Sequence, residues 1–308
     1  MRGAAAAALV VGLALVVACG SGKSSGAGFD APDGGSGADG AVGGEGGGFG
    51  DDASSFPDEG APSGDSGSPA PVAVVYAHSA DVLYRLDANS KQVAVVGPFS
   101  GGCSGVIDIA IDSASNAYVT TTGDLWRVDL HSAACAHIAA GSYPNSLSFV
   151  PKGTLDPNEE TLVGYDGSTY IRIDTASGAV TTVGALSGGY SSSGDIVSVI
   201  GGGTFLTVKG GSQGCSDCLL QIDPKTGDLV QNYGSIAHGD VFGLAFWGGT
   251  AYGFDNGGQI FSIGWQSGKL VTTDIPVPNP PPMLQFWGAG STTSAPPTAA
   301  DGGGIPIQ

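Results

Sequence analysis

Between residues 72 and 290, short runs of alternating apolar and polar residues are separated by turns rich in Gly, Asp and Ser. An alternation with a period of two places successive side chains on opposite faces of a sheet, so each run predicts a β-strand. No run shows the 3.6-residue period of an amphipathic helix. The pattern therefore predicts an all-β domain.

The strand-turn unit occurs five times in this domain. The copies begin at Leu83, Leu125, Tyr170, Leu219 and Ile260, at intervals of 42, 45, 49 and 41 residues. This period is typical of four-stranded propeller blades. We therefore expect a five-bladed β-propeller over 72–290.

Four copies of the repeat carry an aspartate where the motif strand ends, at Asp87, Asp129, Asp174 and Asp223. A carboxylate at the start of a turn accepts hydrogen bonds from the backbone amides of that turn. These four residues are accordingly expected to be structural and not catalytic.

The two ends of the domain are expected to complete one sheet together. The first repeat supplies only three strands, at 72–78, 82–87 and 92–98, and the sequence LAFWG at 244–248 returns as LQFWG at 284–288. Residues 283–289 are therefore predicted to form the missing innermost strand of the first blade. Such closure removes the free sheet edges that would otherwise promote aggregation.

The N-terminus has the features of a targeting segment. Arg2 precedes an unbroken apolar or glycine run over 3–18, and Val16, Val17 and Ala18 lead into Cys19 as in a bacterial lipobox. The run is shorter than the roughly 20 residues that cross a bilayer. We expect a lipoprotein signal peptide over 1–18 and lipidation of Cys19. An ordinary signal peptide is the alternative.

Residues 19–71 predict a disordered linker behind the anchor. Seventeen of residues 20–71 are Gly and five are Pro, and nine are acidic against Lys23 alone. Such a segment buries too little apolar surface to offset the entropy of ordering. Residues 291–308, rich in Pro and Gly, are likewise expected to be a disordered tail.

The lipobox, the linker and strand-turn repeats such as LYRLD, LWRVD and LLQIDPKTG resemble those of bacterial lipoproteins with quinoprotein-like or NHL-like β-propellers. The resemblance is to the proteins of Gram-negative bacteria in which a Gly-rich tether joins the lipid anchor to the propeller. It implies that the mature Cys19 carries acyl chains, palmitate among them, and that Gly20 directs the protein to the outer membrane. The protein would then lie in the cell envelope, on the periplasmic or the surface face.

The composition narrows the classes of partner. The formal net charge is −18 and only 12% of residues are charged, which excludes the basic surface of a nucleic-acid-binding protein. No metal or quinone ligand set can be placed, so no cofactor is expected. We expect a monomer.

Four cysteines remain besides Cys19, and they fit an oxidising compartment. Cys215 and Cys218 are close enough to pair locally, which leaves Cys103 with Cys135. A zinc site built from His131, Cys135 and His137 lacks a fourth ligand. We therefore predict a disulfide between Cys215 and Cys218 and no metal. The pairing of Cys103 with Cys135 stays open, because the two residues are expected at opposite ends of the second blade.

The connections that enter the innermost strands of a propeller ring one mouth of its channel. Here those connections and strand starts carry a set of polar and aromatic residues that could form a ligand mouth: Asp108, Tyr143, Asn145, Tyr190, Asp195, His238 and Asp240. These residues could equally be turn formers and solvated acids.

The leading functional hypothesis is a lipid-anchored envelope protein whose propeller is a binding or scaffold module for a protein, a peptide or a carbohydrate. The alternative is a lyase or glycoside hydrolase that acts through carboxylates at the channel mouth. Two carboxyl groups about 5–10 Å apart over an open channel would favour the enzyme.

Overall fold

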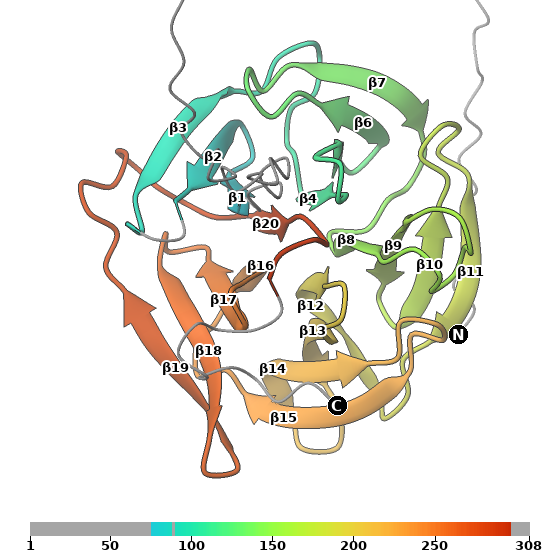
Figure 1. Cartoon of the computed structure of the whole chain (residues 1–308), viewed down its shortest axis with the longest axis vertical. Coiled ribbons are helices and arrows are strands. Elements are labelled where there is room, and N and C mark those ends of the chain that lie inside the picture. Colours follow the sequence, from blue (N-terminus) through green and yellow to red (C-terminus); the bar gives the residue numbers. More distant parts are fainter. Residues whose placement is uncertain (1–74, 88–89, 297–308) are drawn as a thin grey trace, which may run out of the picture. The chain divides into compact units, whose positions relative to one another are not determined.

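The computed structural model describes residues 75–87 and 90–296. These residues form five four-stranded antiparallel sheets around a central axis (Figure 1). No helix occurs in this part of the chain, so it contains no helical segment that could cross a membrane. The predicted all-β, five-bladed propeller is confirmed. The expected signal peptide, Cys19 and the whole of the expected linker lie outside the described residues.

The blades follow one another along the chain, and each runs from an innermost to an outermost strand. Blade 1 consists of β20 (Gly288–Ser291), β1 (Val75–His78), β2 (Val82–Leu86) and β3 (Val93–Pro98). Blade 2 consists of β4 (Asp108–Ile111), β5 (Ala117–Thr120), β6 (Asp124–Val128) and β7 (Cys135–Ala140). Blade 3 consists of β8 (Leu147–Val150), β9 (Thr161–Asp166), β10 (Thr169–Ile173) and β11 (Val180–Ala185).

The last two blades have longer strands. Blade 4 consists of β12 (Tyr190–Ser198), β13 (Thr204–Gly210), β14 (Cys215–Ile222) and β15 (Leu229–Ser235). Blade 5 consists of β16 (Val241–Trp247), β17 (Thr250–Asp255), β18 (Ile260–Gln266) and β19 (Lys269–Ile275). We call the end of the channel where the innermost strands begin the entry end, and the opposite end the exit end.

The apolar core lies between neighbouring blades. Innermost strands such as β4 and β8 are buried along their whole length, whereas outermost strands such as β7 and β11 are largely exposed. The gap between blades 4 and 5, for example, is filled by the fully buried Phe205, Phe246 and Phe261. This packing leaves the two channel ends and the outer gaps between blades as the places where a ligand could bind.

Strand β20 closes the ring by pairing with β1, with Val75 opposite Ser291 and His78 opposite Gly288. The predicted closure is therefore correct, but the predicted strand 283–289 is wrong in register. Phe286 is buried without belonging to a strand, and the Trp287 amide donates to the His78 carbonyl at 2.7 Å. The chain becomes an innermost strand only at Gly288.

Residues 291–296, assigned from the sequence to the C-terminal tail, pack on the propeller. Ser291 ends β20, and Thr292 forms a parallel bridge with Ile111 in blade 2. The Gly249 amide of blade 5 donates to the Pro296 carbonyl at 3.1 Å, and Ala295 is 1% exposed. This short segment therefore links several blades at the exit end, and only residues 297–308 of the expected tail lie outside the described residues.

The turn aspartates have the expected structural role. The Asp129 carboxylate accepts the backbone amides of His131 and Ser132 at 2.9 and 2.8 Å, and Asp174 accepts the Ser177 amide in the same way. The Ser132 hydroxyl also donates to Asp129, and together these bonds lower the pKa of Asp129. These carboxylates are occupied within their own turns.

The predicted disulfide between Cys215 and Cys218 is present, and the structure also pairs Cys103 with Cys135, which the sequence left open. Cys215 bonds to Cys218 at the start of β14, with 5.7 Å between their Cα atoms, and Cys103 bonds to Cys135 with 6.1 Å between Cα atoms. Cys135 is therefore not free to bind zinc. His137, which the zinc site would also have needed, places its Nε2 2.9 Å from Asp124 Oδ1.

Candidate functional site

At the entry end, one residue of each blade occupies an equivalent position, on the innermost strand or just before it and opposite a residue of the second strand. Gly288 lies opposite His78 on the second strand of blade 1, just as Asp108 lies opposite Thr120 in blade 2. We call these five residues the polar layer: Asp108, Ser146, Asp195, Gly243 and Gly288.

Asp108 joins blade 2 to blade 3 through its carboxyl group. Oδ1 accepts the amide of Ile109, the next residue, at 2.7 Å, and Oδ2 accepts the amide of Leu147 in blade 3 at 2.6 Å. Innermost strands have no neighbour on the channel side, so these amides need an acceptor from elsewhere. The carboxyl group supplies it for two blades.

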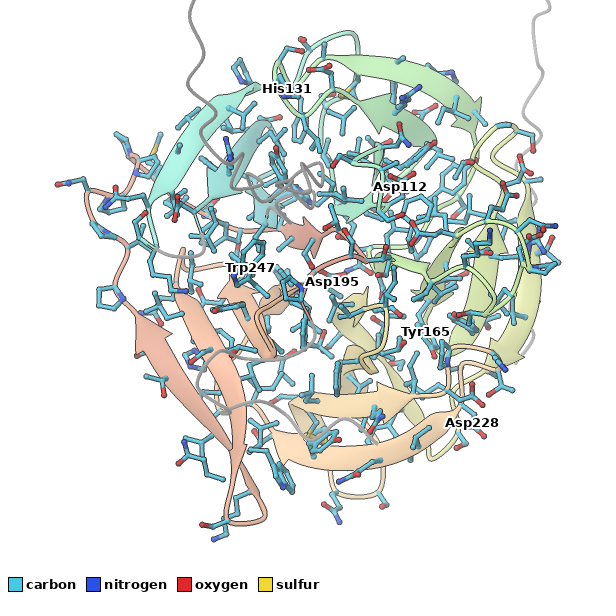
Figure 2. All side chains as sticks on the ribbon, in the orientation of Figure 1. Asp112, His131, Tyr165, Asp195, Asp228 and Trp247 are labelled. Atoms are coloured by element: carbon cyan, nitrogen blue, oxygen red, sulfur yellow. A yellow bond between two sulfur atoms is a disulfide. The ribbon has the colours of Figure 1, made fainter. Side chains whose placement is uncertain are left out.

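Asp195 does the same for the other three blades. Its Oδ1 accepts the Ile196 amide at 2.6 Å, its Oδ2 accepts the Leu244 amide of blade 5 at 2.7 Å, and the Ala289 amide of blade 1 also donates to it. Figure 2 shows Asp195 beside the innermost strands near the central axis. The two aspartates together thus bind one channel-facing amide from every blade.

The two carboxyl groups also hydrogen-bond each other, and neither residue is exposed to solvent. Burial, followed by the negative charge of Asp195, raises the pKa of Asp108 well above its ordinary value. Burial likewise raises the pKa of Asp195, although its hydrogen bonds from amides act in the opposite direction. The two carboxyl groups therefore share a proton, and the negative charge is better placed on Asp195, which accepts three backbone amides, than on Asp108, which accepts two.

Two further buried polar atoms, His78 Nε2 and Ser146 Oγ, belong to the entry end of the blades, and neither has a hydrogen-bond partner among the described residues. A Cβ atom added to Gly288 would overlap His78 Nε2 and lie 2.7 Å from Asp108 Oδ1, so glycine is required there. Burial lowers the pKa of His78 to about 4. Within 75–87 and 90–296, no three His, Cys, Asp or Glu residues are placed to hold a metal ion.

A hollow of about 190 Å³ opens at the entry end. In four of the five blades, the residue immediately before the polar-layer residue forms one wall of this hollow. We call this hollow the cup, and it is lined by Ile107, Asn145, Phe242 and Trp287. Trp287 is 37% exposed, Asn145 is exposed, and the other two are half-buried.

The walls of the cup are fixed by the backbone. The Ile107 amide donates to the Thr120 carbonyl at 2.8 Å, as the Trp287 amide does to His78. The fifth position is Gly194, where any side chain would run into the carbonyl oxygen of Val241. Blade 5 therefore closes over this position, and the cup has four side-chain walls.

The structure brings three of the seven predicted mouth residues together at the channel, namely Asn145 in the cup and Asp108 and Asp195 beneath it. Tyr143 and Tyr190 lie away from the cup and pack in the gaps between blades. The Tyr143 hydroxyl donates to the Gly178 carbonyl at 3.0 Å, and the Tyr190 hydroxyl accepts from Asn232 Nδ2 at 2.8 Å. Both tyrosines serve the core.

His238 and Asp240 also lie away from the cup, in the connection between blades 4 and 5. The His238 ring stacks on Phe261 with 3.7 Å between ring centroids, and its Nε2 lies 3.3 Å from Asp274 Oδ1. The Asp240 amide donates to Asp217 Oδ2 at 3.1 Å. These contacts hold the connection in place.

The arrangement of Asp108 and Asp195 does not match that of a glycoside hydrolase. The two carboxyl groups touch, whereas retaining and inverting enzymes separate theirs by about 5 Å or more to admit the sugar or a water. Both are also buried and saturated by backbone amides. A substrate in the cup would not reach them.

Comparisons with known proteins give little beyond the fold. No protein-family model and no curated protein matches the chain. Among solved structures, a chain of the nidogen/laminin complex is 11% identical with a TM-score of 0.46, covering 71% of this chain and 98% of that one. The Cps50 (Swd1) β-propeller domain of Myceliophteria thermophila is 11% identical with a TM-score of 0.39, covering 63% of this chain and 62% of that one. The propeller assignment rests on the strand pairing described above.

Proposed function

We propose that the propeller is a protein-binding module that holds an apolar side chain of a partner protein or peptide in the cup. The observation that carries this proposal is the convergence of Ile107, Phe242 and Trp287 at the channel entrance. Large apolar side chains are normally buried, and a half-exposed tryptophan in a concave site is typical of binding hot spots.

The polar layer supports the proposed role by making the cup rigid. Each residue of the cup lies two positions before a backbone amide that Asp108 or Asp195 binds, and the amides of Ile107 and Trp287 themselves donate to β5 and β1. A wall that does not move loses little entropy when a ligand docks. Asn145, at the rim, offers amide groups that could bond to the partner's backbone.

Replacing Trp287 by Ala is expected to weaken peptide binding about 30-fold, because truncating a hot-spot residue costs about 2 kcal/mol or more. The probe is a peptide selected from a random-peptide phage library on the full-length protein. Fluorescence anisotropy with the synthesised peptide measures the affinity. We expect the selected sequences to share one aromatic or large aliphatic residue.

The matched control is Val230→Ala, which removes an apolar side chain that is 57% exposed on β15, far from the channel. It should bind the peptide as the unmodified protein does. Equal affinity of the Trp287→Ala variant, with an unchanged melting temperature, would exclude the cup as the site. Selection of glycans from an array with no selection of peptides would identify a carbohydrate module instead.

We further propose that the module is anchored by lipid on Cys19 in the cell envelope, at the outer membrane. The apolar run 3–18 followed by Val16-Val17-Ala18-Cys19 supports this location. Replacing Cys19 by Ser removes the thiol that would carry the diacylglyceryl group. The variant should move from the membrane to the soluble fraction in cell fractionation, and its continued presence in the membrane fraction would refute the lipid anchor.

A further inference from the structure

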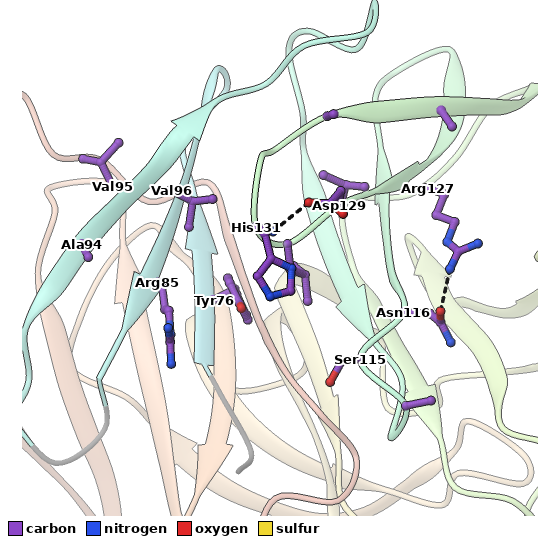
Figure 3. Close-up of a pocket in the computed structure, with 15 residues that line it drawn as sticks. Tyr76, Arg85, Ala94, Val95, Val96, Ser115, Asn116, Arg127, Asp129 and His131 are labelled. Carbon is purple, nitrogen blue, oxygen red and sulfur yellow. Dashed lines mark hydrogen bonds between the residues drawn. The ribbon is translucent and has the colours of Figure 1, made fainter. Parts of the chain in front are cut away.

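A second hollow lies between blades 1 and 2, away from the cup, with a volume of about 820 Å³. Figure 3 shows Arg85 and Val96 on its blade 1 side, His131 on its blade 2 side and Tyr76 between them. Ala94 and Leu130 add apolar surface to its lining. We call this hollow the interblade groove.

The side chains of Tyr76, Arg85 and Ala94 lie on the same face of blade 1, because Arg85 is directly opposite Tyr76 on one neighbouring strand and Ala94 on the other. The arginine is exposed, and it makes no hydrogen bond or ion pair with any described residue. An arginine presents five N–H donors in a planar fork that matches a carboxylate. Its binding capacity is therefore unused in this structure.

The other two arginines in the described part of the chain occupy the same motif position in blades 2 and 3. Arg127 donates to Asn116 Oδ1 at 2.7 Å, and Arg172 acts on Asp174, where its charge helps to lower the pKa of that carboxyl. Although Arg127 borders the groove, it alternates along β6 with Trp126 and Val128, which pack toward blade 1. Its side chain therefore points to the opposite face, and Arg85 is the arginine of the groove.

The Tyr76 hydroxyl is a second donor beside Arg85. Tyr76 is 7% exposed, and its hydroxyl has no hydrogen-bond partner among the residues described. Burial raises the pKa of Tyr76, an effect that the Arg85 charge partly opposes and the Asp129 charge increases. The phenol is therefore neutral at physiological pH and can donate a hydrogen bond to an anion that Arg85 also contacts.

The blade 2 wall of the groove is held in place by covalent and backbone bonds. The disulfide between Cys103 and Cys135 ties the connection between blades 1 and 2 to the start of β7. The Cys135 amide also donates to the Ser100 carbonyl at 2.9 Å. Asp129 on this wall has its carboxylate engaged by its own turn, so it does not neutralise Arg85 by direct contact.

We propose that the interblade groove binds an extended peptide segment in which an acidic side chain is flanked by apolar ones. The carboxylate would lie between Arg85 and the Tyr76 hydroxyl, and the apolar neighbours would contact Ala94, Val96 and Leu130. Charge complementarity within the groove favours this occupant, since Arg85 is an unpaired cation of the lining and the carboxylate of Asp129, the acidic residue of the lining, is engaged by its own turn. The site is separate from the cup and does not depend on the function proposed for it.

The test uses a six-residue peptide of alternating glutamate and valine, blocked at both ends and fluorescently labelled, with the full-length protein. A second peptide with glutamine in place of glutamate keeps the shape and removes the charge. We expect the acidic peptide to bind about tenfold or more tightly than the glutamine peptide, because hydrogen bonds to a charged group contribute about that factor.

The variants are Arg85→Gln and Tyr76→Phe, with Arg172→Gln as the matched control at the same motif position in blade 3. Each of the first two should weaken binding of the acidic peptide about tenfold, while Arg172→Gln leaves it unchanged. Tyr76→Phe keeps the buried ring, so a common melting temperature will show that its loss is local. Equal binding of both peptides, equal loss in Arg172→Gln, or no binding at about 1 mM protein would each overturn the proposal.

Discussion

A chain that ends at Trp287 is expected not to fold. The truncation removes β20, and with it the backbone pairing to all four residues of β1 and the Ala289 amide that binds Asp195. It also removes the exit-end contacts of residues 292–296. Domains are stable by only about 5–15 kcal/mol, and opening the ring leaves backbone groups of β1 unpaired and uncovers the buried Val75 and Ala77, so we expect the loss to exceed that margin. Circular dichroism and size-exclusion chromatography should show an unfolded or aggregated protein.

Two longer chains provide the controls for this truncation. A chain that ends at Pro296 keeps every described contact and should melt as the full chain does. A chain that ends at Thr293 loses the buried Ala295 and the bond from Gly249 to Pro296, and we expect its free energy of unfolding to fall by about 1–3 kcal/mol. A cooperative, unaltered melt of the chain ending at Trp287 would show that β20 does not close the ring.

The closure illustrates which features the sequence could predict. The count of strands required a C-terminal strand in blade 1, and that requirement follows from the repeat period alone. Its register could not be obtained in this way, because the echo of LAFWG in LQFWG does not correspond to equivalent positions. Trp247 ends β16 at the exit end, whereas Trp287 precedes β20 at the entry end.

Asp195→Asn is expected to destabilise the protein more than Asp108→Asn at pH 7, because Asp195 accepts three buried backbone amides and Asp108 two. The Asp195 carboxylate also accepts the proton shared with Asp108. The side-chain NH2 group of an asparagine cannot accept hydrogen bonds, so some of these buried donors would lose their acceptor. Each buried group left without a partner costs about 1–3 kcal/mol, which gives a loss of several kcal/mol for Asp195→Asn. Urea unfolding of both variants measures the difference.

Asp108→Asn should also change how stability depends on pH. The raised pKa of Asp108 means that the folded state holds a proton that the unfolded state releases near pH 4. Stability from this group is therefore complete below about pH 4 and decreases as pH rises toward the raised pKa, by at most about 1.4 kcal/mol per pH unit. Asparagine does not titrate, so the free-energy difference between the unmodified protein and Asp108→Asn should shrink as pH rises.

The comparison of the two proteins at each pH cancels the contribution of His78. Its pKa is lowered to about 4, so His78 opposes the aspartate effect between about pH 4 and 6.5 and is neutral in both states above that range. A constant free-energy difference between pH 5 and 8, or equal losses in Asp108→Asn and Asp195→Asn at pH 7, would contradict the shared proton.

The mouth residues show why topology alone predicts a site only in part. The sequence predicts Asp108 and Asp195 because each stands at the start of an innermost strand, but their burial depends on contacts with other blades. Tyr143 lies only three residues before the polar-layer residue Ser146, but its side chain belongs to the apolar core between blades 2 and 3. A position near a strand start along the sequence is therefore not a position near the channel.

The cup residues escaped prediction for a different reason. Ile107, Phe242 and Trp287 are apolar residues at strand starts, and such residues usually belong to a core. The repeat is recognised by its third-strand motif, whereas these three residues and Asn145 occupy one equivalent position only when the innermost strands are superposed. That superposition needs the strand register, which the structure supplies.

The most direct test of the cup is a two-dimensional nitrogen-proton spectrum recorded while the selected peptide is added. The chain has four tryptophans, so four indole N–H signals report on four separate places. Trp126, Trp247 and Trp265 pack against the core clusters between blades, and only Trp287 lines the cup. The proposed function predicts that the Trp287 signal, identified by its loss in Trp287→Phe, shifts most while the other three stay in place. A saturable shift of one of the other signals with Trp287 unmoved would contradict it.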